Sequence, residues 1–449
     1  MARVMGVDIG TTALKMAVYE TQDGPDPLAL VDQYAQSYSI HTYNNGLFSD
    51  IDSEKWKSAF ISGCKALKAE IATVEAIGLS GTTPGLTALA ADGTALYPSI
   101  LMLDQRSRQQ AARIIERIGM QALLENTGNM PVAGGCSLAS ILWLKDHEPQ
   151  VFERTACFGH SNSAIALWLS GNTAIDPSSA SLSGLYNTVR NDLSWNLQIA
   201  AEMGVAAAKL PPLLQSSQSP GRVKRDLSSQ LGLDARPAVV IGGNDAVVAA
   251  YSLGIEKPGQ VLNVNGTCEI SLVCLPRCLP STRYNVRAHV MPDRWLTLYV
   301  MNAGGKAYEW FQRLFCSEMP MQTFFDEFVP SAIAQWLDRS SSVEYVPYLM
   351  GSRYSQQPLT AAFHGMTDET TREELLAALV RGLCQYQREH LRDIALELPL
   401  AATTSVTGGA VNQAILQAKE RWMRNSSYVM KEQSSMGGAA LLALKHLSG

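Results

Sequence analysis

Short apolar runs alternate along the chain with segments whose apolar residues recur at the period of an α-helix. Strand-like apolar runs occupy residues 76–79, 238–241 and 405–407. Helical periodicity marks residues 53–69, where Ser53 is the expected N-cap, and residues 105–118 and 371–398. This alternation of strands and helices predicts an α/β fold.

Two segments about half a chain apart have the pattern of a β-hairpin. Residues 3–19 and residues 261–273 each contain two strand-like runs separated by a Gly-Thr turn. A repeated strand–turn–strand unit suggests two halves of related architecture. We place the boundary in the 241–244 segment, which gives an N-terminal domain of residues 1–242 and a C-terminal domain of residues 243–449.

The composition is that of an ordinary globular protein. Hydrophobic residues make up 46% of the chain and charged residues 17%, enough to bury sizeable cores. The net charge of −5 gives no basic surplus for nucleic acid or an anionic membrane, so a small-molecule substrate is favoured. The chain shows no signal peptide and no run of 18 apolar residues, so we expect a cytoplasmic protein without a membrane partner. The cysteines are scattered and the histidines form no cluster, so no zinc site is expected.

Four glycine-rich turns follow apolar strands, at residues 8–12, 78–85, 242–245 and 407–412. In open α/β folds, ligands bind beyond the carboxyl ends of strands, where glycine lets the backbone approach a ligand closely. Two of these turns carry an aspartate, Asp8 and Asp245. Each turn alone is compatible with plain turn chemistry, since Asp8 could cap a turn and Asp245 could be a helix N-cap.

Phosphoryl transfer would explain the four turns together. The reaction needs donors for phosphate oxygens, a carboxylate near Mg²⁺ and a residue that orients the attacking hydroxyl. The backbone N–H groups of Gly10, Thr11 and Thr12 and the hydroxyls of the two threonines can supply donors, and Asp8 can hold Mg²⁺. A helix that starts near Asn412 can present its N-terminus to a nucleotide. No Walker sequence is present, which disfavours a P-loop kinase.

These turns and the segments around them resemble the FGGY carbohydrate kinases, a family that includes glycerol, xylulose and gluconate kinases. The resemblance runs through nearly the whole chain in the family's order, at residues 8–15, 78–85, 91–93, 103–106, 176–185, 242–245, 265–267, 347–353, 365–367, 407–412 and 437–440. It implies two actin-like ATPase (ribonuclease H-like) domains of α/β class, with the active site in the cleft between them. It also implies ATP and Mg²⁺ as cofactors and a sugar or polyol hydroxyl as the phosphoryl acceptor.

The resemblance also implies roles for individual residues. Asp245 would be the catalytic carboxylate and would also contact substrate and metal, and Asp8 would bind Mg²⁺. Two phosphate loops and an adenosine loop would hold ATP through Gly10, Thr11, Thr12, Lys15, Gly266, Thr267, Gly408, Gly409 and Asn412. Thr82, Thr83, Asp104 and Arg106 would hold the substrate. Two alternatives stay open: Lys15 as a solvated lysine on a hairpin, and Asp104 with Arg106 as a structural ion pair.

Departures from the family pattern lie mostly on the sugar side. Thr83 and Pro84 stand where xylulose kinases have Met-His, and Met102 replaces a tryptophan. Because a site built to hydrogen-bond hydroxyls discriminates strongly when a contact is lost, we expect weak activity on D-xylulose and glycerol. The expected substrate is a small sugar, polyol or sugar acid, pentulose- or gluconate-like.

Two other functions remain open at this point. A non-catalytic sugar or nucleotide sensor of the same fold would explain the sugar-side departures, but a pure binder has no need of both Asp8 and Asp245. An actin-like ATPase without a sugar substrate would need a further binding domain, which this chain does not contain. The sequence specifies no oligomer, so a homodimer is left open.

Overall fold

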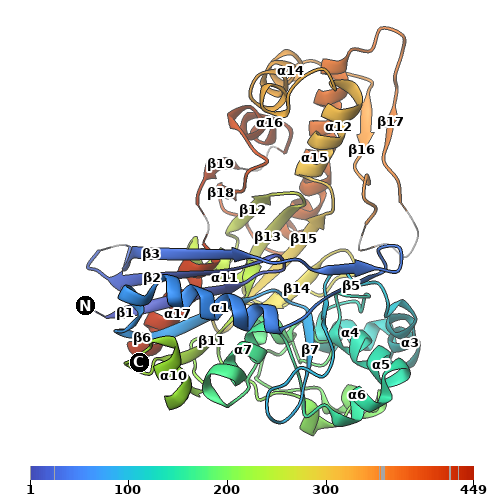
Figure 1. Ribbon diagram of the computed structural model, residues 1–449. Coiled ribbons are helices and arrows are strands. Elements are labelled where there is room, and N and C mark those ends of the chain that lie inside the picture. Colours follow the sequence, from blue (N-terminus) through green and yellow to red (C-terminus); the bar gives the residue numbers. More distant parts are fainter. Residues whose placement is uncertain (1, 25, 353, 355–358, 424–425, 433) are drawn as a thin grey trace.

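The computed structural model describes the chain except for residues 1, 25, 353, 355–358, 424–425 and 433 (Figure 1). Arg353, the last residue of one matching segment, therefore lies outside the described residues. Two large sheets form the frame, the first in the lower part of the view and most of the second in its middle, and helices pack around both.

The first sheet brings the ends of three parallel strands to one edge. Its order is β10-β11-β6-β1-β2-β3. Parallel pairing of β1 with β6 and of β6 with β11 sets Asp8 beside Ser80 and Asn244 beside Gly81. The strands are β1 (Arg3–Ile9), β2 (Ala13–Thr21), β3 (Leu28–Ser37), β6 (Val74–Gly81), β10 (Gly221–Arg222) and β11 (Ala238–Asn244).

The second sheet repeats the arrangement of the first. Its order is β14-β15-β13-β12-β18-β19. Read from β19, it has two parallel pairings followed by two antiparallel pairings, as the first sheet has from β11 to β3. Both predicted hairpins, β1–β2 and β12–β13, are confirmed, and so are two halves of related architecture. The strands are β12 (Val261–Asn265), β13 (Glu269–Leu275), β14 (Asn285–Ala288), β15 (Trp295–Met301), β18 (Thr403–Thr407) and β19 (Ser427–Met430).

Smaller elements complete the fold. A five-stranded sheet contains β4 (His41–Tyr43), β5 (Phe48–Ile51), β7 (Gly85–Leu89), β8 (Ser99–Leu101) and β9 (Cys157–Gly159), and β16 (Glu344–Val346) pairs with β17 (Ala362–His364). Shorter helices are α2 (Lys68–Ile71), α4 (Met120–Thr127), α6 (Pro149–Arg154), α8 (Pro177–Ala180), α9 (Leu197–Glu202), η1 (Ala207–Lys209), α10 (Arg225–Leu231), α13 (Met321–Thr323), η2 (Phe324–Phe328) and α14 (Val329–Trp336). The other helices are α1 (Glu54–Ala66), α3 (Arg108–Ile118), α5 (Ser137–His147), α7 (Ser161–Ser170), α11 (Asp245–Ser252), α12 (Gly305–Phe315), α15 (Arg372–Ala395), α16 (Gln413–Met423) and α17 (Ser435–Leu447).

The predicted helices are present, with shifted ends. Residues 371–398 form α15, where the side chain of Thr371 accepts a hydrogen bond from the Glu374 N–H as an N-cap. Residues 54–66 of the expected 53–69 segment form α1, and Ser53 occupies the N-cap position as expected, although its side chain makes no capping hydrogen bond. The 105–118 helix begins only at Arg108, because Asp104 and Arg106 hold the preceding residues in a turn.

Helices α11 and α17 link the two halves. One hydrophobic cluster contains Val4 and Ala76 of the first sheet, Leu262 and Leu272 of the second, and Leu442 of α17. The C-terminal helix therefore shares its core with strands from the beginning of the chain. The predicted boundary after residue 242 falls inside β11, and the domain limits stay a prediction.

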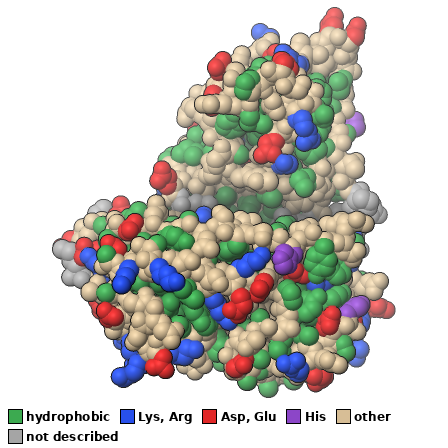
Figure 2. Space-filling model, viewed as in Figure 1, with side chains coloured by type: hydrophobic (Ala, Val, Ile, Leu, Met, Phe, Trp, Pro, Cys, Tyr) green, Lys and Arg blue, Asp and Glu red, His purple; other side chains and the backbone are tan. Residues whose placement is uncertain are grey.

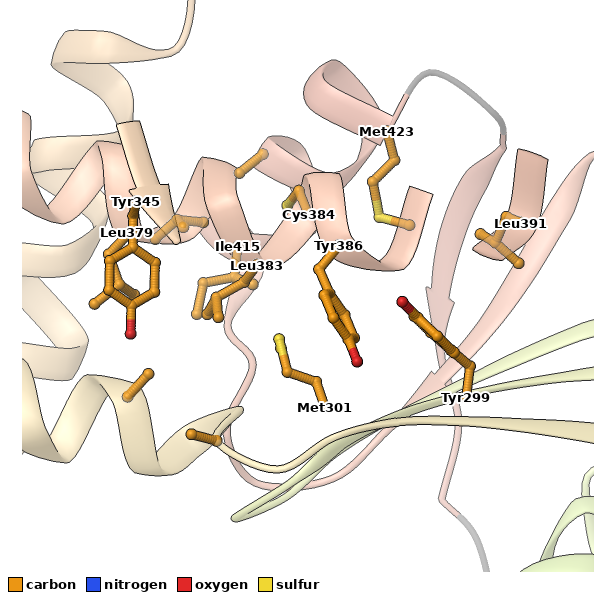
Figure 3. Packing of buried hydrophobic residues seen from close by; sticks show 14 of the residues in the cluster. Tyr299, Met301, Tyr345, Leu379, Leu383, Cys384, Tyr386, Leu391, Ile415 and Met423 are labelled. Carbon is orange, nitrogen blue, oxygen red and sulfur yellow. The ribbon is translucent and has the colours of Figure 1, made fainter. Parts of the chain in front are cut away.

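The second half has its own core beneath α15 and α16. Figure 3 shows Tyr299 and Met301 of β15 facing Leu383 and Tyr386 of α15, with Ile415 of α16 close by. The Tyr299 and Tyr386 rings stack with centroids 4.7 Å apart. Because α16 packs into this core, its first turn is held in a fixed place.

Charges of both signs are interspersed on the face shown in Figure 2, without a large field of one sign. Among the described residues, no helix has both the length and the apolar character that a membrane span requires.

Glycine permits the close approach of α17 to the first sheet. A Cβ on Gly78 would lie 1.9 Å from the carbonyl oxygen of Ala439, and one on Gly6 would lie 1.9 Å from that of Met436. Gly78→Ala should lower the free energy of unfolding by about 2 kcal/mol or more, because backbone must move to admit the methyl group. Urea denaturation measures this change. Glu75→Ala, at an exposed position of the same strand, should change it by less than about 0.5 kcal/mol, and equal effects would contradict the packing account.

Candidate active site

The edge of the first sheet gathers polar side chains from three strand ends. Asp8, near the end of β1, is only 8% exposed and accepts a hydrogen bond of 2.9 Å from Ser80 Oγ of β6. Asn244 ends β11, and Asp245 begins α11. The parallel register therefore brings together the two aspartates on which the sequence prediction rests.

Asn244, and not Asp245, caps helix α11. Asn244 Oδ1 accepts the Val247 N–H at 3.2 Å, and Asn244 Nδ2 donates to Asp245 Oδ1 at 2.8 Å. The Ala246 N–H donates to the same oxygen of Asp245 at 2.8 Å. The alternative in which Asp245 is only an N-cap is therefore wrong. One carboxylate oxygen of Asp245 is fixed, and Oδ2 has no hydrogen-bond partner among the described residues.

Burial makes the charged form of both aspartates unfavourable. Burial raises the pKa of Asp8 to about 6, with a further contribution from the negative charge of Asp245, while Ser80 and Lys15 oppose the shift. Burial also raises the pKa of Asp245, against the positive charge of Arg287 and nearby hydrogen bonds. A divalent cation between such carboxylates would relieve this unfavourable charge.

The donor set fits Mg²⁺. Carboxylate oxygens are the hard ligands that Mg²⁺ prefers, and Mg²⁺ usually takes one or two of them together with water and substrate phosphates. Within the part of the chain that the structure describes, no group of three or more His, Cys, Asp or Glu residues could hold a metal ion. A pair such as Asp8 and Asp245 therefore matches a metal bound partly through nucleotide phosphates.

Thr82 and Thr83 connect the first turn to β11. The Oγ1 atoms of Thr82 and Thr11 are 3.1 Å apart, and the Thr82 N–H donates to the Ile9 carbonyl at 2.9 Å. Thr83 Oγ1 accepts a hydrogen bond of 2.7 Å from Asn244 Nδ2. The expected sugar-side threonines thus lie between the two aspartates.

A buried network behind Asn244 was not recognised as part of the site from the sequence. Asp176 caps α8 by accepting the Ser178 and Ser179 N–H groups, and it also accepts hydrogen bonds from Ser178 Oγ and from Asn162 Nδ2. Ser178 Oγ in turn accepts the Asn244 N–H at 2.9 Å. The 176–181 segment was visible as a family match, but only the structure shows that it fixes the end of β11.

The turns of the second half lie against one another. The Gly304 N–H donates to the Thr267 carbonyl at 2.9 Å, and the Ala410 N–H donates to the Asn265 carbonyl at 3.0 Å. Gly408 has φ +108°, and a Cβ there would lie 2.1 Å from Asn265 O. A Cβ on Gly409 would meet nothing within 4 Å, so this backbone faces open space. The structure therefore brings residues 265–267 and 408–412 together.

Asn412 caps the helix expected from the sequence. Helix α16 begins at Gln413, and Asn412 Oδ1 accepts the Ile415 N–H at 3.0 Å. Asn412 Nδ2 donates to the Phe325 carbonyl at 2.8 Å. The exposed positions facing solvent at these turns include Thr12, Lys15 and Thr267. Lys15 is the cross-strand partner of Asp8, close enough to oppose the rise in its pKa.

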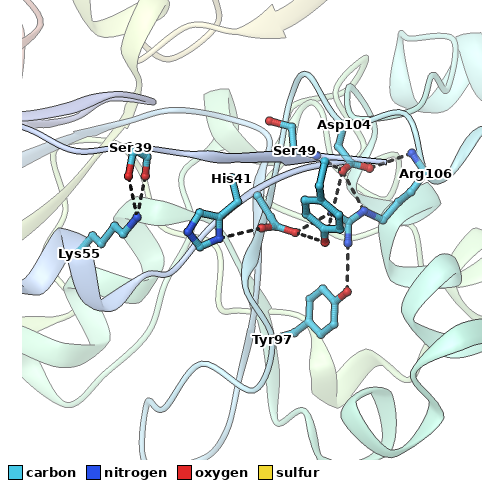
Figure 4. Close-up of polar contacts among 9 residues, drawn as sticks. Ser39, His41, Ser49, Lys55, Tyr97, Asp104 and Arg106 are labelled. Atoms are coloured by element: carbon cyan, nitrogen blue, oxygen red, sulfur yellow. Dashed lines mark hydrogen bonds and ion pairs between the residues drawn. The ribbon is translucent and has the colours of Figure 1, made fainter. Parts of the chain in front are cut away.

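Asp104 and Arg106 form a buried ion-pair cluster of their own (Figure 4). Arg106 donates to Asp104 Oδ2 and Asp50 Oδ2, each at 2.8 Å, and to the Tyr97 hydroxyl at 3.1 Å. Its guanidinium lies 4.3 Å from the centre of the Phe48 ring. Asp104 also accepts the Ser49 N–H at 2.7 Å. This geometry favours the structural alternative, because the polar groups of both residues are engaged inside the protein.

Comparison with known proteins points to one family. The profile of the N-terminal domain of the FGGY family of carbohydrate kinases matches residues 3–252. A xylulose kinase of Staphylococcus xylosus is 26% identical over 451 residues, covering 99% of this chain and 90% of the relative. The structure of the present chain resembles that of a xyloylose kinase from Brucella ovis, with a TM-score of 0.89 and 24% identity. The match covers 100% of this chain and 91% of the neighbour. A gluconate kinase from Lactobacillus acidophilus gives a TM-score of 0.88, 21% identity and coverage of 100% and 89%. The two-domain, actin-like ATPase fold expected from the sequence is confirmed.

The shifted pKa of Asp8 has a consequence for the stability of the metal-free protein. Its folded-state pKa of about 6 lies above the ordinary value of 3.8, so the protonated form is favoured by folding. The stabilisation is complete below pH about 4 and is lost as the pH rises through about 6, and it amounts to at most about 3 kcal/mol. Asp8→Asn should remove this pH dependence, so the variant gains stability relative to the parent as the pH rises.

Urea denaturation between pH 4 and 7.5, without Mg²⁺ or nucleotide, measures the difference between parent and variant. Asp234→Asn, at an exposed turn, serves as the control and should follow the parent. If the free energy of unfolding depends on pH in the same way in Asp8→Asn and in the parent, the raised pKa assigned to the Asp8 carboxylate is wrong.

Proposed function

The chain belongs to the FGGY family of carbohydrate kinases, and from that premise we propose that Asp245 is the catalytic carboxylate of its ATP-dependent phosphoryl transfer. Its relatives by name are kinases of sugars, which supports a carbohydrate kinase over a sensor or a sugar-independent ATPase. The observation that carries the proposal is the placement of Asp245. One oxygen is fixed by Asn244 and Ala246, and the other is not engaged by the described residues.

We propose that the acceptor hydroxyl lies against Asp245 Oδ2. A carboxylate is a far weaker base than an alkoxide, so early removal of the hydroxyl proton is unfavourable. In a loose transition state the proton can pass to Asp245 late, and its main work is to orient the hydroxyl for in-line attack. Asn244 holds the carboxylate in that orientation and holds Thr83 beside it.

In this proposal, turns of both halves bind the phosphates of ATP, and a turn of the second half binds the adenosine. Thr11 and Thr12 in the first phosphate loop and Thr267 in the second would donate to phosphate oxygens, with Lys15 at the rim. The N–H groups of Gly10 and Gly266 close the two hairpin turns on the Ala13 and Cys268 carbonyls, so these glycines would contribute by letting the phosphates approach the backbone closely. Gly408, Gly409 and Asn412 face the adenosine. Asp8, with Asp245, would hold Mg²⁺, which would neutralise phosphate charge when bound.

The substrate side is proposed to consist mainly of Thr82 and Thr83. Asp104 and Arg106 would contribute by fixing the 102–106 turn, since their own polar groups pair with Asp50, Ser49 and Tyr97. The proposed acceptor is a small sugar, polyol or sugar acid. We further propose a cytoplasmic protein without nucleic-acid or membrane partners, with a homodimer left open.

A panel of acceptors tests this function. ADP release is measured with a coupled assay in the presence of Mg²⁺-ATP and each of a set of ketopentoses, aldonic acids and polyols. We expect release that depends on one or a few of these acceptors. Release that is independent of any acceptor would indicate an ATPase, and nucleotide binding without release would indicate a sensor; either result overturns the proposal.

Within that panel, D-xylulose and glycerol should be poor acceptors. Thr83 and Pro84 replace the Met-His of xylulose kinases, and the Thr83 hydroxyl is already bonded to Asn244. A lost hydrogen bond in a polar site can reduce kcat/KM by about 10⁴-fold. The measurement is kcat/KM for each acceptor. Efficient turnover of D-xylulose with a sub-millimolar KM would show that the substitutions at this loop do not control specificity.

Asp245→Asn should separate catalysis from stability. Asn keeps Oδ1 as an acceptor for Asn244 and Ala246, and the N-cap belongs to Asn244, so the melting temperature should change little. The variant cannot accept the hydroxyl proton, so kcat should fall by about 10²–10⁴-fold. Nucleotide affinity should be kept or improved, because one negative charge near the phosphates is removed.

The matched control is Asp226→Asn, an exposed aspartate in the first turn of α10. It should leave kcat unchanged. Both variants are measured for kcat, ADP affinity and melting temperature on the same preparation. A folded Asp245→Asn protein with near-normal kcat would rule out Asp245 as the catalytic carboxylate.

A further inference from the structure

A buried ion pair lies directly behind the turns of the second half. Lys419 of α16 donates to Glu269 Oε1 of β13, and the side chains are only 3% and 5% exposed. Removing two charges from water is costly, and a buried pair is often no more stable than apolar residues of similar volume. Stability alone therefore does not account for this pair, and the groups to which it is hydrogen-bonded indicate its role.

Hydrogen bonds connect this pair to the 265–267 turn. Glu269 Oε1 also accepts a hydrogen bond of 3.0 Å from Asn263 Nδ2. Asn263 Oδ1 accepts one of 2.9 Å from Asn265 Nδ2. Glu269 and Asn265 are opposite each other across the β12–β13 hairpin, so they close the turn that contains Gly266 and Thr267.

The same pair is connected to the 408–412 turn from the other side. Lys419 lies on α16, whose first turn is capped by Asn412. The Ala410 N–H donates to the Asn265 carbonyl at 3.0 Å, and Gly408 packs against that carbonyl. Lys419 is thus connected to Ala410 by successive contacts through Glu269, Asn263 and Asn265. The chain from Ala410 to α16 connects the same residues covalently.

We propose that Lys419 and Glu269 are positioning residues that hold the second phosphate loop and the adenosine loop at a fixed spacing, so that the two ends of ATP bind as one unit. The inference rests on the proposed function, because it takes these turns as the nucleotide contacts. Both side chains lie behind the turns and act on the nucleotide through Asn263, Asn265 and the start of α16.

A ligand that needs both turns should be more sensitive to the pair than a ligand that needs one. Lys419→Met should weaken Mg²⁺-ADP by about tenfold or more, equivalent to about 1.4 kcal/mol. Adenosine, which uses only the 408–412 turn, should lose less than about threefold. In steady-state assays KM for ATP should rise while KM for the sugar stays the same. Isothermal titration calorimetry with ADP and with adenosine measures the two affinities.

Two further variants separate positioning from stability. Lys419→Met combined with Glu269→Leu removes both buried charges, so its melting temperature should be near that of the parent, yet ADP should still bind weakly. Asn263→Leu leaves the ion pair intact and breaks its connection to Asn265, and it should reproduce the loss of ADP affinity. Arg421→Met is the control on the same helix, since Arg421 pairs at 2.7 Å with Asp338 in an exposed ion pair, and it should bind ADP normally.

The results distinguish the two proposals. If the parent binds ADP and phosphorylates a sugar, but the double variant and Asn263→Leu bind ADP as tightly as the parent, the positioning role is overturned and the kinase function stands. If ADP and adenosine are weakened equally in all variants, the pair is merely structural and the inference is again wrong. A parent protein that binds no ADP would overturn the proposed function and this inference with it.

Discussion

The candidate site depends on the forced proximity of two carboxylates in a place with little water. Asp8 and Asp245 are brought together because β1, β6 and β11 run parallel and end at one edge of the first sheet. Burial, with a further contribution from the negative charge of Asp245, raises the pKa of Asp8 to about 6, and hydrogen bonds from Ser80 and Asn244 hold the two carboxylates in place. Because buried carboxylates are unfavourable in their charged form, this arrangement favours binding of a cation. Mg²⁺ together with a nucleotide can provide that charge.

The surrounding packing makes this arrangement rigid. Helix α17 lies against β1 and β6 at the distance that Gly6 and Gly78 allow, and α11 shares a hydrophobic cluster with it. Since α11 begins at Asp245, the cluster that fixes α11 also fixes the carboxylate. Asn244 connects helix, strand and substrate loop in one side chain, because its oxygen caps α11 and its nitrogen reaches both Asp245 and Thr83.

Much of the frame could be predicted from the sequence, because its signals are local. The β1–β2 and β12–β13 hairpins follow from apolar runs around Gly-Thr turns, and the apolar period of α15 with Thr371 before it marks that helix. The choice of N-cap for α11 was not predictable in this way, since Asn244 and Asp245 are equally good capping residues and only the end of β11 decides between them.

Pairings between distant residues had no local signal at all. Arg106 contacts Asp50 from 56 positions along the chain, and this contact turns a residue expected to touch the substrate into part of a closed ion-pair cluster. Lys419 and Glu269 are 150 positions apart. For such pairs, the separation along the chain does not indicate whether the side chains meet, and only the tertiary fold determines their contact.

The two halves have similar sheet orders, but their hairpins differ in where the acidic side chain lies and in whether a basic side chain pairs with it. Counting back from the Gly-Thr turn, Asp8 of β1 corresponds to Val264 of β12, so the second hairpin has no carboxylate at that strand end. It does carry Glu269 next to its turn, where an uncompensated negative charge would repel phosphate oxygens. Lys419 cancels that charge inside the protein and leaves Glu269 free to act as a hydrogen-bond acceptor for Asn263. The first hairpin, with Asp8, can thus attract a cation, while the second can lie close to polyphosphate. The difference arises because Lys419 neutralises Glu269 in a buried ion pair, whereas Asp8 has no such partner among the ion pairs of the described residues.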